Sequence, residues 1–173
     1  GAHIAPTEPA PEGVRIQDVA HALSMICRGN GHVTQFFSVG QHCLACEAEA
    51  HAAGLPRSVR IACLLHDASE AYISDITRPV KLGLPEYRVI EKRLQDTIYR
   101  RFGIDPEDSA VMSEVSRIDD TMLYHEFLAL GGCALFDEAP PKITDPEFAF
   151  RPFDEVEVQY LKTLMELYNS EEQ

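Results

Sequence analysis

The chain has no tryptophan, few aromatic residues and no long apolar run. A membrane-spanning helix needs about 20 consecutive apolar residues, whereas the longest apolar stretches are short pieces such as Ile61–Leu65. The N-terminus also lacks the basic region and apolar stretch of a secretory signal. We therefore expect no membrane partner and a soluble, cytoplasmic protein.

Basic residues are scarce as well. The chain has 15 Lys and Arg against 28 Asp and Glu, which gives a formal net charge of −13. A nucleic-acid-binding module normally presents a basic face, so we expect no nucleic-acid partner. A small phosphorylated substrate remains compatible with this charge, because a bound metal ion and one or two cations can supply local positive charge.

Cysteine provides no disulfide framework. The cysteines are odd in number and stand among apolar neighbours, which is typical of reduced core thiols; they are Cys27, Cys43, Cys46, Cys63 and Cys133. Cys43 and Cys46 also have the CxxC spacing of half a zinc site. No second such pair follows and both lie in a helical pattern, so we predict core thiols.

The 173 residues suffice for one domain with a single core. Prolines and a glycine in residues 1–13 predict an extended arm, followed by one helical domain over 14–173. Helical periodicity predicts the following helices: from 16 to the glycines at 29 and 31, then 36–53, 58–74, 86–102, 107–130 and 154–168. Between them we expect a loop at 79–85 and an irregular segment at 131–153 with a short extended piece at 133–136. The predicted fold is a compact all-α bundle.

His66 and Asp67 directly follow the apolar stretch 62–65, and Glu70 comes four residues after His66. If 58–74 is one helix, His66 and Glu70 share a face and Asp67 lies about 100° round from His66. Ionisable groups on a core helix need partners, because burying them unpaired is costly. A divalent cation would satisfy them together.

A site of imidazole and carboxylate ligands suits Mn, Co, Fe, Ni or Zn, and the sequence does not choose among these metals. The site needs further ligands from other helices. His42 is the best candidate upstream and Asp119 the best candidate downstream. Either residue alone could equally be an ordinary structural residue.

The order His42…His66-Asp67…Asp119 resembles the H…HD…D signature of the HD-domain phosphohydrolases, an all-α superfamily. Residues 66–81, HDASEAYISDITRPVK, look like the corresponding segment of bacterial 5′-deoxynucleotidases and their phage-borne relatives. Residues 18–42 resemble the phage-borne branch more closely. The resemblance covers residues 14–130 and implies an HD-type helical bundle.

The resemblance also implies a role for each matching residue. One divalent metal ion would be bound by four ligands: His42, His66, Asp67 and Asp119. Asp119 is preferred to Asp120 because Asp119-x-x-Met122-Leu123-x-x-Glu126 matches the family's spacing. Glu70 would orient or deprotonate the attacking water, a role within reach of a carboxylate one turn from the ligands. Asp75 would contact the sugar hydroxyl or assist proton transfer.

Two cations and one histidine are candidates for holding the substrate. By resemblance Arg28 would hold the phosphate, with Lys81 as a second possibility; a cation capping the end of the first helix is the alternative for Arg28. His32 lies in a glycine-flanked loop, where it either reaches a phosphate or faces solvent.

The implied function is a metal-dependent phosphomonoesterase that releases phosphate from nucleoside, and by preference deoxynucleoside, 5′-monophosphates through a water activated at the metal. A homodimer is implied too. Two alternatives stay open: hydrolysis of another small phosphorylated metabolite or nucleotide, and a non-catalytic HD domain that binds a nucleotide. In the 5′-deoxynucleotidases a tryptophan that helps reject ribonucleotides follows the arginine. Gly29 follows Arg28 here, which weakens the expectation of deoxy-sugar selectivity.

Overall fold

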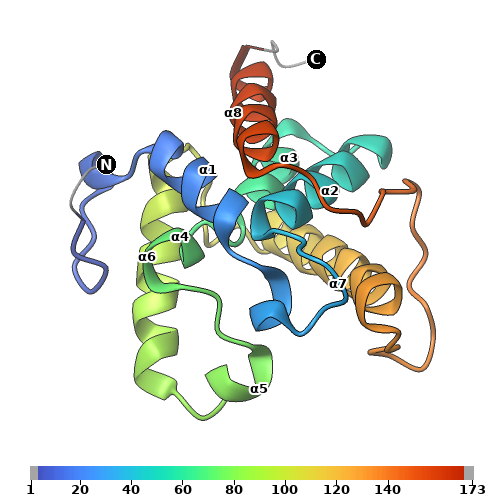
Figure 1. Cartoon of the computed structure of the whole chain (residues 1–173). Coiled ribbons are helices and arrows are strands. Elements are labelled where there is room, and N and C mark those ends of the chain that lie inside the picture. The colour runs from blue at the N-terminus through green and yellow to red at the C-terminus, as the bar shows by residue number, and fades with distance from the viewer. Residues whose placement is uncertain (1–3, 170–173) are drawn as a thin grey trace.

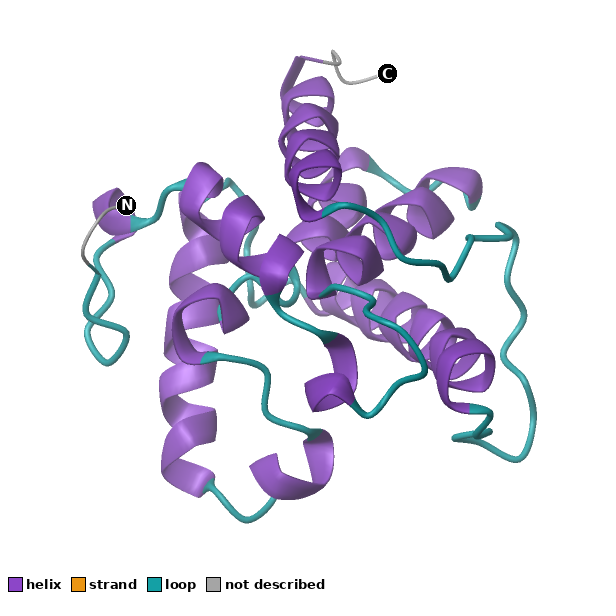
Figure 2. Cartoon of the chain, viewed as in Figure 1, coloured by secondary structure: helices purple, strands orange, loops and turns teal. Residues whose placement is uncertain are grey.

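Helix α3 (Arg57–Leu65) lies at the centre of the computed structural model, which describes residues 4–169 (Figure 1). It packs against α2 (Val39–Ala52), α7 (Ser109–Gly131) and α8 (Phe153–Asn169). Its apolar stretch Ile61–Leu65 is buried in the core cluster. The described residues form helices and loops without a β-strand (Figure 2), which confirms the predicted all-α bundle.

The remaining helices surround this centre, and none of the described helices is long and apolar enough to cross a membrane. They are η1 (Pro11–Gly13), α1 (Ile16–Met25), η2 (Arg28–Gly31), α4 (Glu70–Ile73), α5 (Arg78–Lys81) and α6 (Pro85–Arg101). Residues 1–3 of the predicted arm lie outside the described range. Residues 4–13 contain only the short η1 and pack along α6, where Arg93 donates a hydrogen bond of 2.8 Å to the Thr7 carbonyl.

Capping residues account for the start of α2 and α7, the helices that carry the candidate ligands His42 and Asp119. Ser38 and Gln41 form a reciprocal capping box at the start of α2, which satisfies backbone N–H groups that have no partner inside the helix. The Asp108 carboxylate does the same at the start of α7 by accepting from the backbone N–H groups of Ala110 and Val111. These caps fix where α2 and α7 begin, and therefore which residues face α3.

Gly40 lets three helices approach one another closely. A Cβ at this position would lie 3.0 Å from Val156 Cγ1 on α8 and 3.3 Å from the backbone of Leu23 on α1. Such contacts are tighter than close-packed side chains allow. The glycine therefore places α2 directly against α1 and α8, two residues before His42.

The predicted continuous helix 58–74 is wrong in its centre. Helix α3 ends at Leu65 and α4 begins at Glu70. Between them the backbone forms turns with i to i+3 hydrogen bonds, such as Glu70 N–H to Asp67 O at 3.0 Å. These tighter turns change the angular spacing assumed for His66 and Glu70.

Three other details differ from the sequence prediction. The expected loop 79–85 overlaps the short helix α5 and the start of α6. The expected extended piece at 133–136 is a loop that forms no strand. Cys43, Cys46 and Cys63 are buried free thiols as predicted, but Cys27 is only partly buried and Cys133 is exposed.

Side chains cap the end of α3. They contact its last four carbonyl groups, which lack the backbone N–H donor that carbonyls inside a helix have. The four pairs are Tyr99 Oη to Ala62 O at 3.4 Å, His66 Nδ1 to Cys63 O at 2.7 Å, Tyr160 Oη to Leu64 O at 2.5 Å, and Gln95 Nε2 to Leu65 O at 2.8 Å. The donors come from α6, α8 and the turn itself. Tertiary contacts therefore end α3 at the point where His66 and Asp67 follow.

We expect Tyr160→Phe to lower the free energy of unfolding by about 1–3 kcal/mol, because it leaves the buried Leu64 carbonyl without its donor. Tyr160 is fully buried. The matched control is Tyr168→Phe, because Tyr168 donates to the Phe102 carbonyl at an exposed position where water can replace the hydroxyl. This control should lose less than about 0.5 kcal/mol. Urea unfolding followed by circular dichroism measures both, and equal losses would contradict the argument.

Candidate metal centre

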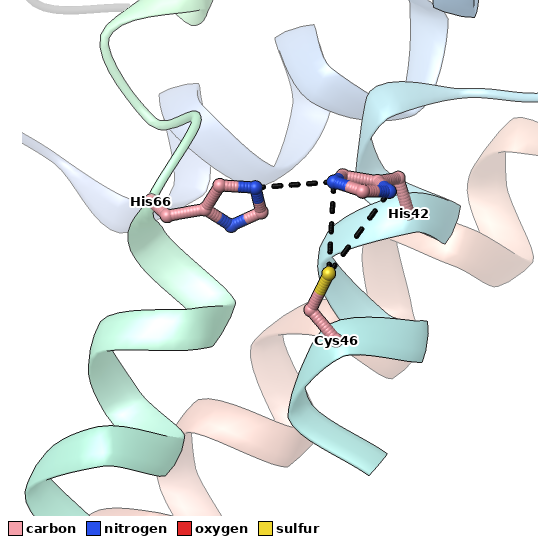
Figure 3. Close-up of side chains that lie close together, drawn as sticks. All are labelled: His42, Cys46 and His66. Carbon is pink, nitrogen blue, oxygen red and sulfur yellow. Dashed lines mark hydrogen bonds between the residues drawn. The ribbon is translucent and has the colours of Figure 1, made fainter. Parts of the chain in front are cut away.

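The four predicted ligands meet at one point between α2, α7 and the turn after α3. His42 lies on α2, His66 and Asp67 occupy the turn, and Asp119 lies on α7. His42 Nε2 is 3.1 Å from His66 Nε2, 3.1 Å from Asp119 Oδ1 and 3.9 Å from Asp67 Oδ2. His66 Nε2 is 3.4 Å from Asp67 Oδ2 and 3.6 Å from Asp119 Oδ1. Figure 3 shows the two imidazoles approaching each other through these nitrogens.

The hydrogen bonds of the opposite ring nitrogens determine the tautomer of each histidine. His42 Nδ1 lies 2.5 Å from Glu126 Oε1, and His66 Nδ1 lies 2.7 Å from the Cys63 carbonyl. Both partners are acceptors, so each Nδ1 carries a hydrogen. In the neutral rings the two Nε2 lone pairs then face each other at 3.1 Å. Two lone pairs at this distance repel unless a proton or a metal ion lies between them.

The spacing of the donor atoms fits a divalent transition metal. Such an ion binds imidazole nitrogen and carboxylate oxygen at about 2.0–2.2 Å, so neighbouring ligand atoms stand roughly 3.0–3.5 Å apart. Three of the five separations, at 3.1, 3.1 and 3.4 Å, lie in this range, and the other two, at 3.6 and 3.9 Å, would have to shorten when a metal binds. Two imidazoles and two carboxylates also form a donor set typical of Mn, Co, Fe, Ni and Zn.

Two buried thiols lie beside this cluster, and the sequence analysis placed them only in the core. Cys43 is close to His66 and Asp67, and Cys46 is close to both histidines (Figure 3). Cys46 Sγ is 3.6 Å from His42 Nε2 and 4.0 Å from His42 Nδ1, so it lies beside the ring and not along the Nε2 lone pair. Burial raises the pKa of Cys43, which favours a protonated thiol over a thiolate ligand. The imidazoles and carboxylates remain the better ligand set.

The electrostatics of the cluster favour positive charge at its centre. Burial lowers the pKa of His66, but the Asp67 carboxylate and other neighbours outweigh it, so the pKa lies well above its usual value. Burial raises the pKa of Asp119, but the neighbouring His42 and His66 rings outweigh it and hold the pKa well below its usual range. Both shifts show that the carboxylates favour positive charge at this point.

Arg28 and Glu126 form a buried ion pair beside the ligands. Arg28 Nε donates to Glu126 Oε2 at 3.2 Å and Arg28 Nη1 donates to Asp67 Oδ2 at 3.3 Å. Arg28 is 7% exposed and Glu126 is 1% exposed. Helix α1 ends at Met25, so the alternative role of Arg28 as its cap is wrong. The guanidinium instead borders an oxygen of Asp67, one of the candidate ligands.

Glu126 is a site residue that sequence reasoning used only as part of a spacing match. It accepts from His42 through one oxygen and from Arg28 through the other. Such a partner orients the ring of a metal-binding histidine and raises its basicity. The signal was present, because Glu126 follows Asp119 by two helical turns and therefore lies on the same face of α7.

Glu70 borders the cluster without belonging to the four ligands. Its Oε1 lies 3.6 Å from Lys81 Nζ, whereas its Oε2 is buried and has no hydrogen-bond partner among the described residues. Burial, with the carboxylates of Asp67 and Asp75, raises its pKa well above the usual range. A buried carboxylate oxygen without a partner is unusual, and a polar ligand such as water would satisfy it.

Asp75 and Lys81 also lie near this group. Burial raises the pKa of Asp75. The Asp67 carboxylate raises this pKa as well, whereas the charges of Arg28 and Lys81 lower it. Lys81 donates to Glu91 at 2.5 Å in addition to its contact with Glu70. The structure thus brings both predicted residues to the edge of the cluster.

The sequence left His32 between a phosphate contact and a solvent-facing loop position, and it did not single out Arg78. His32 is exposed after η2, and no side-chain contact with the ligands is recorded for it. Arg78, which the sequence analysis did not single out, contacts Asp119 Oδ2 at 3.8 Å and Asp120 Oδ1 at 3.3 Å. Asp120 is therefore paired with an arginine at the rim, while Asp119 faces the histidines.

Comparison with known proteins gives relatives without a stated activity. No protein-family model matches the chain. It is 35% identical over 120 residues to the uncharacterized protein YfdR of Escherichia coli K12, covering 69% of this chain and 63% of that protein. It is 33% identical over 121 residues to the uncharacterized protein RCAP_rcc00048 of Rhodobacter capsulatus, covering 66% of this chain and 61% of that protein. The chain thus spans less than two thirds of the length of either relative.

Proposed function

We propose that the chain is a metal-dependent phosphohydrolase of the HD type that acts on nucleoside 5′-monophosphates. The observation that carries the proposal is the convergence of His42 Nε2, His66 Nε2 and Asp119 Oδ1 within 3.1–3.6 Å, with Asp67 Oδ2 3.4 Å from His66. Both histidines present lone pairs to the same point. These four residues would hold one divalent ion.

The bound ion would supply Lewis acidity toward a phosphoryl oxygen and lower the pKa of water. The chain's own residues would carry out the remaining steps around the metal position. Glu70 Oε2, buried and unpaired, would accept a hydrogen bond from the attacking water and take its proton. Arg28 would hold the phosphoryl oxygens, because its guanidinium already borders Asp67 Oδ2 and is planar with several donors. Asp75 would assist at the sugar or leaving group.

A non-catalytic nucleotide-binding domain is the competing proposal. Glu70 argues against it, because a site that only binds an anionic nucleotide gains nothing from a buried carboxylate at its centre. The carboxylate is useful where a water must be oriented. Hydrolysis of a different small phosphate ester stays open, since the ligands and Glu70 would serve any such ester.

Metal-reconstituted turnover tests the proposal. Protein stripped with a chelator and reloaded with Mn²⁺, Co²⁺ or Ni²⁺ is expected to release phosphate from at least one 5′-monophosphate, and the stripped protein is expected to release none. Asp67→Ala should abolish both stoichiometric metal binding and turnover. Absence of turnover with all three metals would reject the enzyme, and full metal binding by Asp67→Ala would reject the ligand set.

The same panel distinguishes the substrate classes when it includes AMP, dAMP and a non-nucleotide phosphate. Gly29 has φ = +56° and its added Cβ would lie 3.1 Å from Phe127 Cζ. A larger side chain is therefore strained in this backbone conformation. With no bulky group at position 29, we expect AMP and dAMP to be hydrolysed at rates within about tenfold of each other, a difference of about 1.4 kcal/mol.

A further inference from the structure

The short helix α5 carries two cations three residues apart, and each contacts a different carboxylate of the candidate metal centre. Arg78 Nη2 lies 3.8 Å from Asp119 Oδ2, and Lys81 Nζ lies 3.6 Å from Glu70 Oε1. Helix α5 packs mainly with α6 and lies away from α3 in Figure 1. Its contacts with the centre are therefore made through these long side chains.

Arg78 and Arg28 differ in how firmly they are held. Arg28 is 7% exposed and pairs with the buried Glu126. The Arg78 side chain is 64% exposed, and its partners Asp119 and Asp120 are 25% and 42% exposed. Exposed ion pairs contribute little to stability, so Arg78 can leave its carboxylates at small cost. One arginine is fixed and the other is exchangeable.

The position of Arg78 suits an anion at the metal. Asp119 directs Oδ1 toward His42 Nε2 at 3.1 Å and Oδ2 toward Arg78 at 3.8 Å. The guanidinium therefore borders one oxygen of a ligand whose other oxygen faces the metal position. Its planar fork of donors matches two oxygens of a phosphoryl group better than it matches one carboxylate oxygen.

We propose that Arg78 is a second phosphate-binding residue, which exchanges the carboxylates of Asp119 and Asp120 for the phosphoryl oxygens of the substrate. The inference rests on the proposed function. Asp120 then acts as a competitor, because it holds both Nη atoms of Arg78 at 3.3 Å in the free protein. Removing the arginine and removing its competitor must change affinity in opposite directions.

Calorimetric titration of the Mn²⁺-loaded protein with inorganic phosphate tests this pair of effects. Arg78→Ala is expected to raise the Kd for phosphate about tenfold, the loss of one charge-assisted contact. Arg78→Lys should recover part of the affinity, because an ammonium keeps the charge but not the fork. Asp120→Asn should lower the Kd by about two- to threefold, the smaller effect of removing an exposed competitor. Arg88→Ala, an exposed arginine on α6, is the matched control and should leave it unchanged.

The KM of the best monophosphate should follow the phosphate Kd in all four variants. An unchanged Kd in Arg78→Ala, or no phosphate binding by the unmodified protein, overturns the inference. Weaker binding in Asp120→Asn also overturns it, because the pair would then only hold α5 in place. Arg78-dependent phosphate binding without ester hydrolysis would reject the proposed function and leave this inference standing. Hydrolysis whose KM does not change in Arg78→Ala would reject this inference and leave the proposed function standing.

Discussion

Replacing Glu70 with glutamine is expected to lower kcat on the best 5′-monophosphate by about 10²- to 10⁴-fold, the usual contribution of a positioned general base. Glutamine has nearly the same shape, but its amide cannot take a proton from water. Glu70 stands outside the four ligands, so the variant should still bind one metal ion per chain. Phosphate-release kinetics and metal analysis of the same preparation check both halves of this expectation.

Glu91→Gln is the matched control for this substitution. Both glutamates contact Lys81, at 3.6 Å for Glu70 and 2.5 Å for Glu91, so either change removes one anionic partner of the lysine. Only Glu70 also has a buried oxygen without a partner. We expect Glu91→Gln to lower kcat by less than about tenfold. Comparable losses in the two variants would mean that Lys81 pairing, and not proton transfer, explains the effect.

The candidate metal ligands could be named from the sequence on two grounds, one local and one from family resemblance. His66 and Asp67 follow an apolar run, and charged groups in that position require a partner. His42 and Asp119 stood out only as the best candidates upstream and downstream, and the family resemblance gave them the role of ligands. The bundle then brings the three segments together, with separations of 3.1–3.9 Å between their donor atoms.

The break after Leu65 could not be predicted in the same way. Residues within the break, such as His66 and Ser69, keep right-handed helical dihedral angles. The sequence pattern therefore predicts one continuous helix. The break depends on donors to the α3 carbonyls from Gln95 and Tyr160, which are distant in sequence. Tertiary hydrogen bonds decide such helix boundaries, and the hydrophobic periodicity of the sequence carries no information about these bonds.

Arg78 was missed for a related reason. Its position depends on the path of the chain between α4 and α6, where Ser74 adopts φ = +69°, a conformation that non-glycine residues seldom adopt. No periodic pattern predicts where such a segment places a side chain. Lys81 was found only because it falls within a motif that resembles a known family.

The largest effect on stability is expected from Glu126→Ala. This change removes the acceptor of both Arg28 and His42 and leaves the buried Arg28 guanidinium with a single hydrogen-bonded carboxylate, Asp67. Breaking a buried pair in this way typically costs about 3–5 kcal/mol of unfolding free energy. Loss of the group that orients a ligating histidine should also weaken metal affinity about 10- to 100-fold. Urea unfolding of metal-free protein and chelator competition measure the two effects separately.

Two further variants distinguish a charge effect from a packing effect. Glu114→Ala removes a partly exposed glutamate on the same helix, paired with Arg117 at 2.7 Å, and should change stability by less than about 0.5 kcal/mol. The double variant Arg28→Met/Glu126→Leu removes both buried charges, and we expect it to be more stable than Glu126→Ala because no unpaired guanidinium remains. Its metal affinity should stay low, since His42 Nδ1 still lacks its carboxylate. If the double variant were no more stable than Glu126→Ala, the buried pair would not be the cause of the loss.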